Sequence, residues 1–539
     1  MVEYIEDTIG PSPLMEDQER RCWDLVVGSG DLVDARLCAS MTKGPHFTRQ
    51  AWYGERLDQS RLDRFYISER GEWIHHIKKR DAPTKFFFAR LKAKLSQEEM
   101  SGVVDTQGRL VEEEGEVLQE VHKFYKELYT EEVETEECRT KREQILRLVD
   151  RGFTEEQNRR LEAEPDKELI TEIVRDLPKE KSPGLDGVTA EILVLGWEFM
   201  QQDCFWMVGE VWRRKSLWGK DRKGVIKLIP KNKRKHLLQN WRPITLLTTT
   251  YKIIAKIFAR RLKEMLPALI DEQQTGFVAG RNIIDNILSL RLAQEWAQVS
   301  DQNCIFIKLD FMKAYDRIAH GYLWDTLRAM GMGQDTLERI KGLVVGGSAV
   351  VHVNGLFTKE FELQRGVRQG CPLAPLLFAM FTQPLMRLLR EEERRGNIHG
   401  MNIGGESTLL HQLFADDTGI SITMEEQQFA RLQEVIREYE QASGARLNVQ
   451  KSTIMQLNPG PAPEWLADTG CEIARPDRPF VYLGVQTSSP VDERSITESI
   501  VQKMMKKLNH WSNKLLSWPA KTCVGSKSPI STHVSRTLS

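Results

Sequence analysis

Residues 409–420 read LLHQLFADDTGI, in which an apolar segment leads directly into the adjacent pair Asp416 and Asp417 and then into a second short apolar segment. Two like charges at the edge of a core repel each other and resist desolvation. A divalent cation between them is the simplest way to stabilise such a pair. A doublet of aspartates is also common in a polar turn, so by itself it leaves both interpretations open.

A third carboxylate, Asp310, ends another apolar segment. Residues 304–309 read CIFIKL, and Asp310 follows directly. Carboxylates at two strand ends suit a two-metal site for phosphoryl transfer. Magnesium prefers oxygen ligands and keeps part of its water shell, so one or two protein carboxylates for each ion are sufficient. We therefore predict Asp310 and Asp416 as bridging metal ligands, with Asp417 adjacent to them.

Composition sets broad limits on the protein. The chain has 539 residues, of which 40% are apolar and 28% charged, and its net charge is −1. These values are ordinary for a globular protein. The charges are nevertheless segregated, because residues 213–263 hold seventeen Lys or Arg and one acid, whereas residues 111–137 hold eleven Glu. This segregation indicates a local site for a polyanion.

Other classes of protein are disfavoured. The eight cysteines include no C-x-x-C pair, which argues against a disulfide framework and a zinc knuckle. No apolar stretch reaches the roughly 18 residues that span a membrane. The acidic N-terminus lacks the features of a signal peptide. We predict an intracellular protein, in the nucleus or the cytoplasm, without a membrane segment.

The spacing of apolar and turn residues predicts the elements around the carboxylates. Strands are expected at 225–229, 304–310 and 481–485, and hairpins at 407–423 and at 349–364 around Asn354-Gly355. Helices are expected from Thr245, from about Ala314, over 374–395 and over 425–443. Thr154 and Gln157 are placed for a capping box.

Further residues could handle a nucleotide. Tyr315 follows Asp310 closely, and its ring could stand under a sugar and exclude a 2′-hydroxyl; a core tyrosine is the alternative. Gln369 and Gly370 lie in a Gly/Pro loop before a helix, where a backbone can approach a ligand closely. The alternative is a purely structural loop.

Three basic residues complete this set. Lys231 and Arg242 flank a basic loop and are suited to gripping the β- and γ-phosphates of a nucleoside triphosphate. Lys451 could protonate the departing pyrophosphate. For each of them, a solvated surface position is the alternative.

The motifs together resemble the reverse transcriptase of non-LTR (LINE-type) retrotransposons over about residues 81–518. The resemblance rests on six motifs in the right order: NWRPI (240–244), GF with GR (276–277, 280–281), LDF with KAYD (309–311, 313–316), QGCPL (369–373), FADD (414–417) and YLG (482–484). It implies an α+β fold, a right-hand polymerase whose small antiparallel palm sheet is backed by helices. It also implies a helical N-terminal linker and an incomplete thumb.

The resemblance assigns roles by position. It implies that Asp310, Asp416 and Asp417 bind metal and that Lys451 is the motif lysine. It assigns the nucleotide contacts to Lys231, Arg242, Phe311, Tyr315, Gln369 and Gly370. It assigns the template and primer contacts to Gly280, Arg281, Tyr482, Leu483 and Gly484. The implied cofactor is two Mg²⁺ ions, with Mn²⁺ as a substitute, and the implied partners are an RNA template, a DNA primer and deoxynucleoside triphosphates.

The resemblance also predicts domain boundaries and two departures from the family. We expect an endonuclease-tail remnant at 1–80, a charged linker at 81–165, fingers at 166–295, palm at 296–490, the start of a thumb at 491–520 and a disordered tail at 521–539. The residues of a complete nuclease are missing, and the thumb pattern stops early. The sequence therefore predicts a reverse transcriptase, with an inactive truncated remnant that at most binds nucleic acid as the alternative.

Overall fold

The computed structural model describes residues 99–487, with gaps at 233, 406, 459 and 476–478, and a few short segments outside that range. Those segments include two antiparallel pairs of strands, β1 (Leu32–Asp34) with β4 (Tyr66–Ser68) and β2 (Trp52–Tyr53) with β3 (Arg56–Leu57). Apart from these strands and the helical residues 498, 501–502 and 505, the predictions for 1–80, 491–520 and 521–539 lie outside the described residues.

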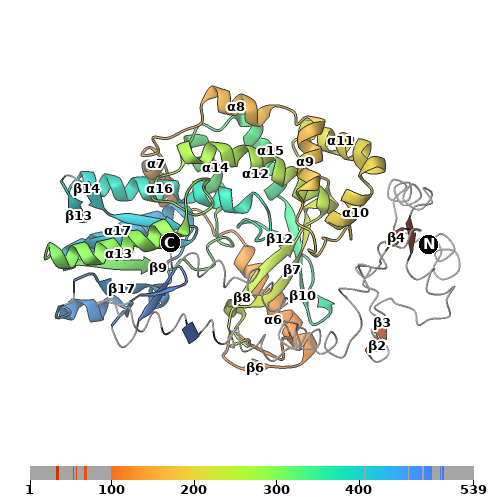
Figure 1. Cartoon of the computed structure of the whole chain (residues 1–539). Coiled ribbons are helices and arrows are strands. Elements are labelled where there is room, and N and C mark those ends of the chain that lie inside the picture. The colour runs from red at the N-terminus through yellow and green to blue at the C-terminus, as the bar shows by residue number, and fades with distance from the viewer. Residues whose placement is uncertain are drawn as a thin grey trace.

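Within the described part of the chain, two five-stranded sheets form the framework (Figure 1). The first, which we call the β7 sheet, has the order β11-β10-β7-β8, with β12 also paired to β10. Its strands are β7 (Lys223–Pro230), β8 (Trp241–Leu246), β10 (Gly347–Val353), β11 (Leu356–Phe357) and β12 (Phe361–Leu363). Helix α6 (Glu114–Tyr129) packs on it, because Tyr125 shares a buried cluster with Ile226 and Trp241.

The second sheet, which we call the aspartate sheet, has the order β15-β16-β9-β17-β18. Its strands are β9 (Cys304–Leu309), β15 (His411–Phe414), β16 (Asp417–Thr423), β17 (Thr453–Gln456) and β18 (Glu472–Ile473). The central strand β9 is antiparallel to β16 and to β17, whereas β17 and β18 are parallel. In Figure 1 this sheet lies at the left, beside α13 and α17.

Side chains alternate between the two faces of a strand, and β9 follows this rule. Ile305, Ile307 and Leu309 belong to the large core shared with the helices, whereas Phe306 belongs to a separate cluster on the other face. The same alternation puts Lys308 and Asp310 on the Phe306 face. The strand therefore fixes one face in the helical core and brings charged side chains to the other face at its end.

The helices surround these sheets. In chain order they are α7 (Glu136–Leu146), α8 (Glu155–Glu162), α9 (Lys167–Arg175), α10 (Ala190–Leu195), α11 (Trp197–Arg214), α12 (Thr249–Leu269), α13 (Ile283–Val299), α14 (His320–Ala329), α15 (Gln334–Val344), α16 (Ala374–Arg394) and α17 (Glu426–Ser443). Three small hairpins pair β5 (Val103–Val104) with β6 (Leu110–Val111), β13 (Met401–Gly404) with β14 (Ser407–Leu409), and β19 (Phe480–Tyr482) with β20 (Val485–Thr487). No described helix is long and apolar enough to cross a membrane.

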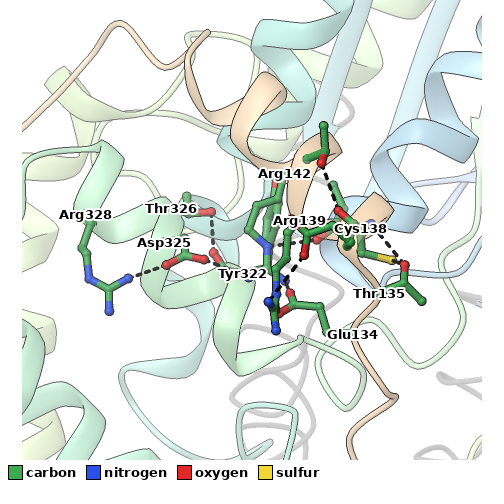
Figure 2. A network of polar contacts seen from close by, with 12 residues as sticks. Glu134, Thr135, Cys138, Arg139, Arg142, Tyr322, Asp325, Thr326 and Arg328 are labelled. Atoms are coloured by element: carbon green, nitrogen blue, oxygen red, sulfur yellow. Dashed lines mark hydrogen bonds and ion pairs between the residues drawn. The ribbon is translucent and has the colours of Figure 1, made fainter.

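An ion-pair cluster fastens α7 to α14 (Figure 2). Arg142 of α7 pairs with Glu134 and, at 2.8 Å, with Asp325 of α14. Arg139 contacts Glu134 at 3.0 Å, and Arg328 pairs with Asp325. We call these five residues the Arg142 cluster. The Arg142 side chain is only 11% exposed, so its charge depends on these partners.

Several sequence predictions are confirmed. The strand at β9 and the helices α16 and α17 lie where the patterns placed them. Asn354 and Gly355 both have positive φ and join β10 to β11, as a tight hairpin turn requires. The capping box of Thr154 and Gln157 starts α8. The predicted mixture of helices and sheets is also confirmed.

Two predicted helix starts are wrong. Thr245 belongs to β8, where it pairs with Ile226, and α12 begins only after Thr248 caps its first turn. The helix expected from about Ala314 begins at His320 instead. Lys313 adopts a φ of 47°, and residues 312–317 form turns rather than a helix.

Two strand predictions also need correction. The strand expected at 481–485 is a hairpin, because Leu483 and Gly484 both have positive φ and form a two-residue turn. The hairpin expected at 407–423 is formed by β15 and β16 alone, while residues 407–409 pair with β13. Local apolar pattern indicated extended chain in both cases but not where the chain reverses.

Candidate active site

The two adjacent aspartates lie at a tight hairpin between β15 and β16. Phe414 pairs with Asp417, so Ala415 and Asp416 form the two-residue turn. Ala415 has a φ of 57°, as the first central residue of a type II′ turn has. Asp416 is exposed at the tip. The prediction of a polar turn and the prediction of a functional carboxylate are thus compatible.

Two residues from another segment hold this turn. The side-chain oxygen of Gln274 accepts hydrogen bonds from the backbone N–H of Ala415, at 3.0 Å, and of Gly276, at 2.9 Å. A Cβ on Gly276 would lie 2.3 Å from the Ala415 nitrogen, which only glycine avoids. The position of the carboxylates is therefore set by contacts from outside the aspartate sheet.

The sheet register brings the third carboxylate to the same place. Thr418 pairs with Leu309, so Asp417 and Asp310 follow next on their two strands. The Asp310 backbone is held by Ser452, whose hydroxyl oxygen accepts from its N–H at 3.2 Å. The structure thus joins Asp310 to the aspartate hairpin, as predicted from sequence.

The electrostatics of Asp310 and Asp416 reflect this crowding. Partial burial raises the pKa of Asp310, the positive charges of nearby lysines oppose the rise, and Asp417 adds to it. Although Asp416 reaches solvent at the tip of the turn, the surrounding protein partly desolvates it and raises its pKa, and the charges of Asp417 and Asp310 add to that effect. Among the described residues, no side chain forms an ion pair with Asp310 or Asp416.

Asp417 is different because it already has a cation. Lys308 lies 3.1 Å from its carboxylate and also donates to the Val481 carbonyl at 3.3 Å. In the described part of the chain, no three acidic, His or Cys side chains stand close enough together to form a preformed metal site. Asp310 and Asp416 are nevertheless oxygen donors whose mutual repulsion a divalent cation would relieve, so these residues fit such an ion.

Basic residues from two distant segments approach the carboxylates. The charges of Lys231 and Lys451 both act on Asp310. Desolvation lowers the pKa of Lys231, and repulsion from Lys451 and Arg242 lowers it further. Arg242 is exposed on β8, where it pairs with Ile229 of β7. The structure therefore brings together three basic residues that the sequence separates widely.

The two aromatic candidates are packed beside the carboxylates. The Tyr315 ring stacks on Phe378 with centroids 4.7 Å apart, and its pKa is raised by burial and then by the nearby Asp416 charge. The packed ring confirms the interpretation of Tyr315 as a core residue, and its role at the sugar of a nucleotide stays a prediction. Phe311 bridges to Leu447 through its backbone and lies half-buried.

The loop of Gln369 and Gly370 rests on β8. The Gln369 carbonyl accepts from the Thr245 N–H at 2.7 Å. Gly370 has a φ of 111°, and a Cβ there would lie 2.7 Å from the Thr245 oxygen. The Gln369 amide nitrogen donates to Asp316 at 3.0 and 3.2 Å. A side chain at 370 would lift the loop from the strand that carries Arg242.

The predicted template and primer residues divide into held and exposed ones. Arg281 donates to backbone carbonyls, including those of Gln274 and Pro267, so its guanidinium holds the chain locally. Gly280 is exposed, with a φ of 79°. Tyr482 is 1% exposed and packs edge-on against Phe306, with centroids 5.1 Å apart, while the turn at Leu483 and Gly484 leads away from it. 

The site contains residues for which sequence analysis assigned no role. They are Gln274, Lys308, Lys313 and Asp316. One of them, Lys308, left a signal in the sequence, because it precedes Asp310 by two positions on a strand and must share its face. Lys313 and Asp316 stand within the quoted motif, but only the fold shows that burial lowers the pKa of Lys313 to about 8 and raises that of Asp316 to about 6.

A mainly antiparallel sheet with carboxylates at adjacent strand ends, beside lysines and a glycine loop, is the kind of site that nucleic-acid polymerases use for phosphoryl transfer. Residues 229–487 match the family described as "Reverse transcriptase (RNA-dependent DNA polymerase)", so this part of the chain is similar to reverse transcriptases. The match includes both sheets, except for residues 223–228 at the start of β7.

Proteins of mobile elements are similar to this chain. The "Transposon TX1 uncharacterized 149 kDa protein" of Xenopus laevis is 28% identical over 450 residues, which are 82% of this chain and 33% of that protein. The "Retrovirus-related Pol polyprotein from type-2 retrotransposable element R2DM" of Drosophila melanogaster is 30% identical over 35% of this chain and 17% of its own length. The "Probable RNA-directed DNA polymerase from transposon BS" of the same species is 25% identical over 40% of this chain and 24% of its own.

These similarities confirm the resemblance to the reverse transcriptases of non-LTR retrotransposons. The alignments cover about a third, a sixth and a quarter of these three relatives. This chain therefore matches only part of each relative, and the activity of a whole relative is a proposal for this chain.

Proposed function

We propose that this chain is an RNA-directed DNA polymerase that adds deoxynucleotides to the 3′-hydroxyl of a DNA primer on an RNA template. The observation that carries the proposal is the approach of Asp310 to the Asp416 hairpin, with Lys231 and Lys451 beside them. The proposal assigns residues 166–295 to fingers and 296–490 to a palm. We propose that the activity is intracellular, in the nucleus or the cytoplasm.

Magnesium is the proposed cofactor, held by Asp310 and Asp416 with Asp417 beside them. When bound, Mg²⁺ neutralises charge on the attacking and leaving oxygens of phosphoryl transfer, and Mn²⁺ is the expected substitute. The carboxylates contribute oxygen ligands at fixed positions, because the hairpin is held by Gln274 and the end of β9 by Ser452. Lys308 pairs with one oxygen of the Asp417 carboxylate, and its positive charge opposes the binding of a cation there.

The other residues act on the nucleotide. Lys231 and Arg242 attract its triphosphate through charge, and Lys451 is the proposed proton donor to the departing pyrophosphate. Tyr315, packed on Phe378 beside Asp416, excludes a 2′-hydroxyl from the sugar position. Gln369 and Gly370 face the base pair being formed, and Phe311 supports this side of the site.

We propose that the template–primer duplex contacts the remaining predicted residues. Gly280 and Arg281 lie on the template side, and Tyr482, Leu483 and Gly484 form the primer-side hairpin. That hairpin is anchored through Tyr482 on Phe306 and through the Lys308 bond to Val481. Such a duplex is held mainly through its backbone, so its affinity falls steeply with added salt.

A primer-extension assay tests the proposal. Purified full chain is given an RNA template, a DNA primer, deoxynucleotides and Mg²⁺, beside an Asp416→Asn/Asp417→Asn double variant and an Asp335→Asn control on the far helix α15. Incorporation by the wild type and the control, and none by the double variant, supports the polymerase. Wild-type incorporation no higher than that of the double variant overturns it and leaves the inactive remnant, whose binding a salt titration then measures.

A further inference from the structure

The end of α6 is fastened to the loop that carries Gln369. The Tyr129 carbonyl accepts from the N–H of Gln364 at 2.9 Å and of Arg365 at 3.3 Å. The Arg365 guanidinium donates to the Leu128 carbonyl at 2.7 Å. Helix α6 precedes residues 229–487, the part that matches the reverse transcriptase family. A segment outside that match therefore supports the glycine loop inside it.

A single buried carboxylate connects the same helix to the Gln369 side chain. The Tyr129 hydroxyl donates to Asp316 at 2.8 Å, and the Gln369 amide nitrogen donates to the same carboxylate at 3.0 and 3.2 Å. Asp316 is 0% exposed. Gly366 approaches so closely that a Cβ there would lie 2.6 Å from the Asp316 carbonyl oxygen. A buried carboxylate costs free energy unless hydrogen-bond donors satisfy it. Two of its donors here are the Tyr129 hydroxyl and the Gln369 amide, so the carboxylate connects α6 to the glycine loop.

The arrangement fixes the orientation of an amide. An amide side chain has a donating end and an accepting end, whereas an ionised carboxylate only accepts. The Gln369 nitrogen must therefore face Asp316, and its oxygen must point away from it. The Tyr129 hydroxyl donates to one oxygen of the Asp316 carboxylate, and this hydrogen bond restricts the orientation of that carboxylate. Lys313 supplies the nearby positive charge that the buried carboxylate requires.

We propose that Tyr129 and Asp316 are positioning residues that orient the Gln369 side chain toward the incoming nucleotide, which makes the end of α6 part of the active-site support. The proposal rests on the proposed function, because Gln369 is taken to contact the nucleotide. It goes beyond that function by assigning a role in nucleotide recognition to a helix outside the family match.

The test measures nucleotide recognition in four variants of the full chain. They are Tyr129→Phe, which removes one hydroxyl, Asp316→Asn, Gln369→Ala and, as a matched control, Tyr439→Phe. The control keeps its ring and loses a buried hydroxyl that donates to the Phe381 carbonyl at 3.2 Å in the helical layer. We measure kcat and KM for one deoxynucleotide, its equilibrium binding to a complex with a chain-terminated primer, and the unfolding temperature.

Loss of one such hydrogen bond corresponds to roughly a three- to tenfold change. Tyr129→Phe should raise KM and the nucleotide dissociation constant by that factor, with kcat less affected, while Tyr439→Phe changes neither. Adding Tyr129→Phe to Gln369→Ala should have little further effect, because both act through one group. A purely structural role predicts equal losses in both backgrounds, or a fall in unfolding temperature without a change in KM, and either result overturns the inference.

The binding measurement keeps this inference separate from the proposed function. If the wild type binds nucleotide on the primer complex but does not incorporate it, the polymerase proposal fails and the Tyr129 effect on binding still decides the inference. If the wild type binds no nucleotide, the inference is overturned as well. Should Asp316→Asn fail to fold, Tyr129→Phe alone carries the test.

Discussion

Two clusters of charged residues in this protein follow opposite rules. In the Arg142 cluster every carboxylate has a guanidinium partner, and the contacts tie α7 to α14 (Figure 2). In the aspartate sheet, Asp310 and Asp416 approach each other without an ion pair among the described residues. Desolvation raises the pKa of Asp416, and the charges of Asp417 and Asp310 raise it further. The first arrangement lowers the free energy of the fold, whereas the second raises it.

The difference indicates what each cluster is for. Charges that satisfy one another are complete without a ligand. Charges that repel one another persist where something from outside relieves them, which is the pattern of a functional site. The comparison therefore predicts that substitutions in the two clusters separate activity from stability.

The largest effect is expected from the carboxylates. Asp416→Asn and Asp310→Asn should each reduce primer extension by about a thousandfold or more, since ligands of a catalytic metal contribute several kcal/mol. Neither should lower stability. A pKa that is raised in the folded state means that the ionised carboxylate costs stability near pH 7, and asparagine removes that cost. Extension rates and unfolding temperatures measure the two parts, and a large loss of stability would contradict the comparison.

The reverse is expected for the Arg142 cluster. Arg142→Ala should destabilise the fold by about 1–3 kcal/mol, because it leaves Glu134 and Asp325 without their shared partner. Activity per folded molecule should be unchanged. Urea denaturation measures the free energy. Arg159→Ala, which breaks an exposed pair with Glu156, is the control and should change it by less than about 1 kcal/mol.

Lys308 combines features of both clusters, because it forms an ion pair and its partner, Asp417, is one of the aspartates of the candidate site. Lys308→Met should tighten apparent Mg²⁺ binding by about fivefold, because one nearby positive charge is worth on the order of 1 kcal/mol at a partly exposed site. A Mg²⁺ titration of the unfolding temperature measures this without requiring activity. Lys223→Met, which breaks a pair with Glu360 on the β7 sheet, should leave the titration unchanged. Weaker binding in Lys308→Met would show that Lys308 does not compete with the metal.

The smallest effect concerns pH. Burial raises the pKa of Asp316 to about 6, opposed by Lys313 and by hydrogen bonds from Tyr129 and Gln369, against an ordinary value of 3.8. Because the folded pKa is the higher one, this group favours folding at low pH, and that contribution is lost as pH rises through about 6. Protonation also deprives the Gln369 amide of its anionic acceptor.

KM for the nucleotide should therefore rise about two- to threefold as pH falls from 7 to 5.5, while the stability contribution of Asp316 moves the opposite way. Asp316→Asn should show a flat KM over this range. Steady-state kinetics with buffers of constant ionic strength check the slope. The same slope in wild type and Asp316→Asn would assign it to another group, such as Asp310 or Asp416, whose pKa values are also raised by desolvation.

Much of the site was predictable because its parts are local. An apolar strand that ends in an aspartate, or two aspartates between apolar segments, can be recognised from neighbouring residues alone, without knowledge of how the chain folds. The order and spacing of the motifs pointed to the family that residues 229–487 match.

What could not be predicted depends on contacts between distant segments. Gln274 holds the aspartate turn from another part of the chain, and Tyr129 reaches Asp316 from α6. The turn at Leu483 and Gly484 was missed because its apolar neighbours resemble one continuous strand. The late start of α14 was missed because a positive φ at Lys313 is fixed by its surroundings rather than by its type.

The pairing of β9 has a consequence for how the protein is made. The strand that ends at Asp310 is central in its sheet, yet its two neighbours are residues 417–423 and 453–456. During synthesis from the N-terminus, β9 leaves the ribosome long before either neighbour exists, with both of its edges open. A sheet whose neighbouring strands are distant in sequence forms slowly, and until it forms its unpaired strand edges can pair with other chains. The same topology that assembles the carboxylates therefore leaves the edges of β9 unpaired, and open to aggregation, until β17 has been synthesised.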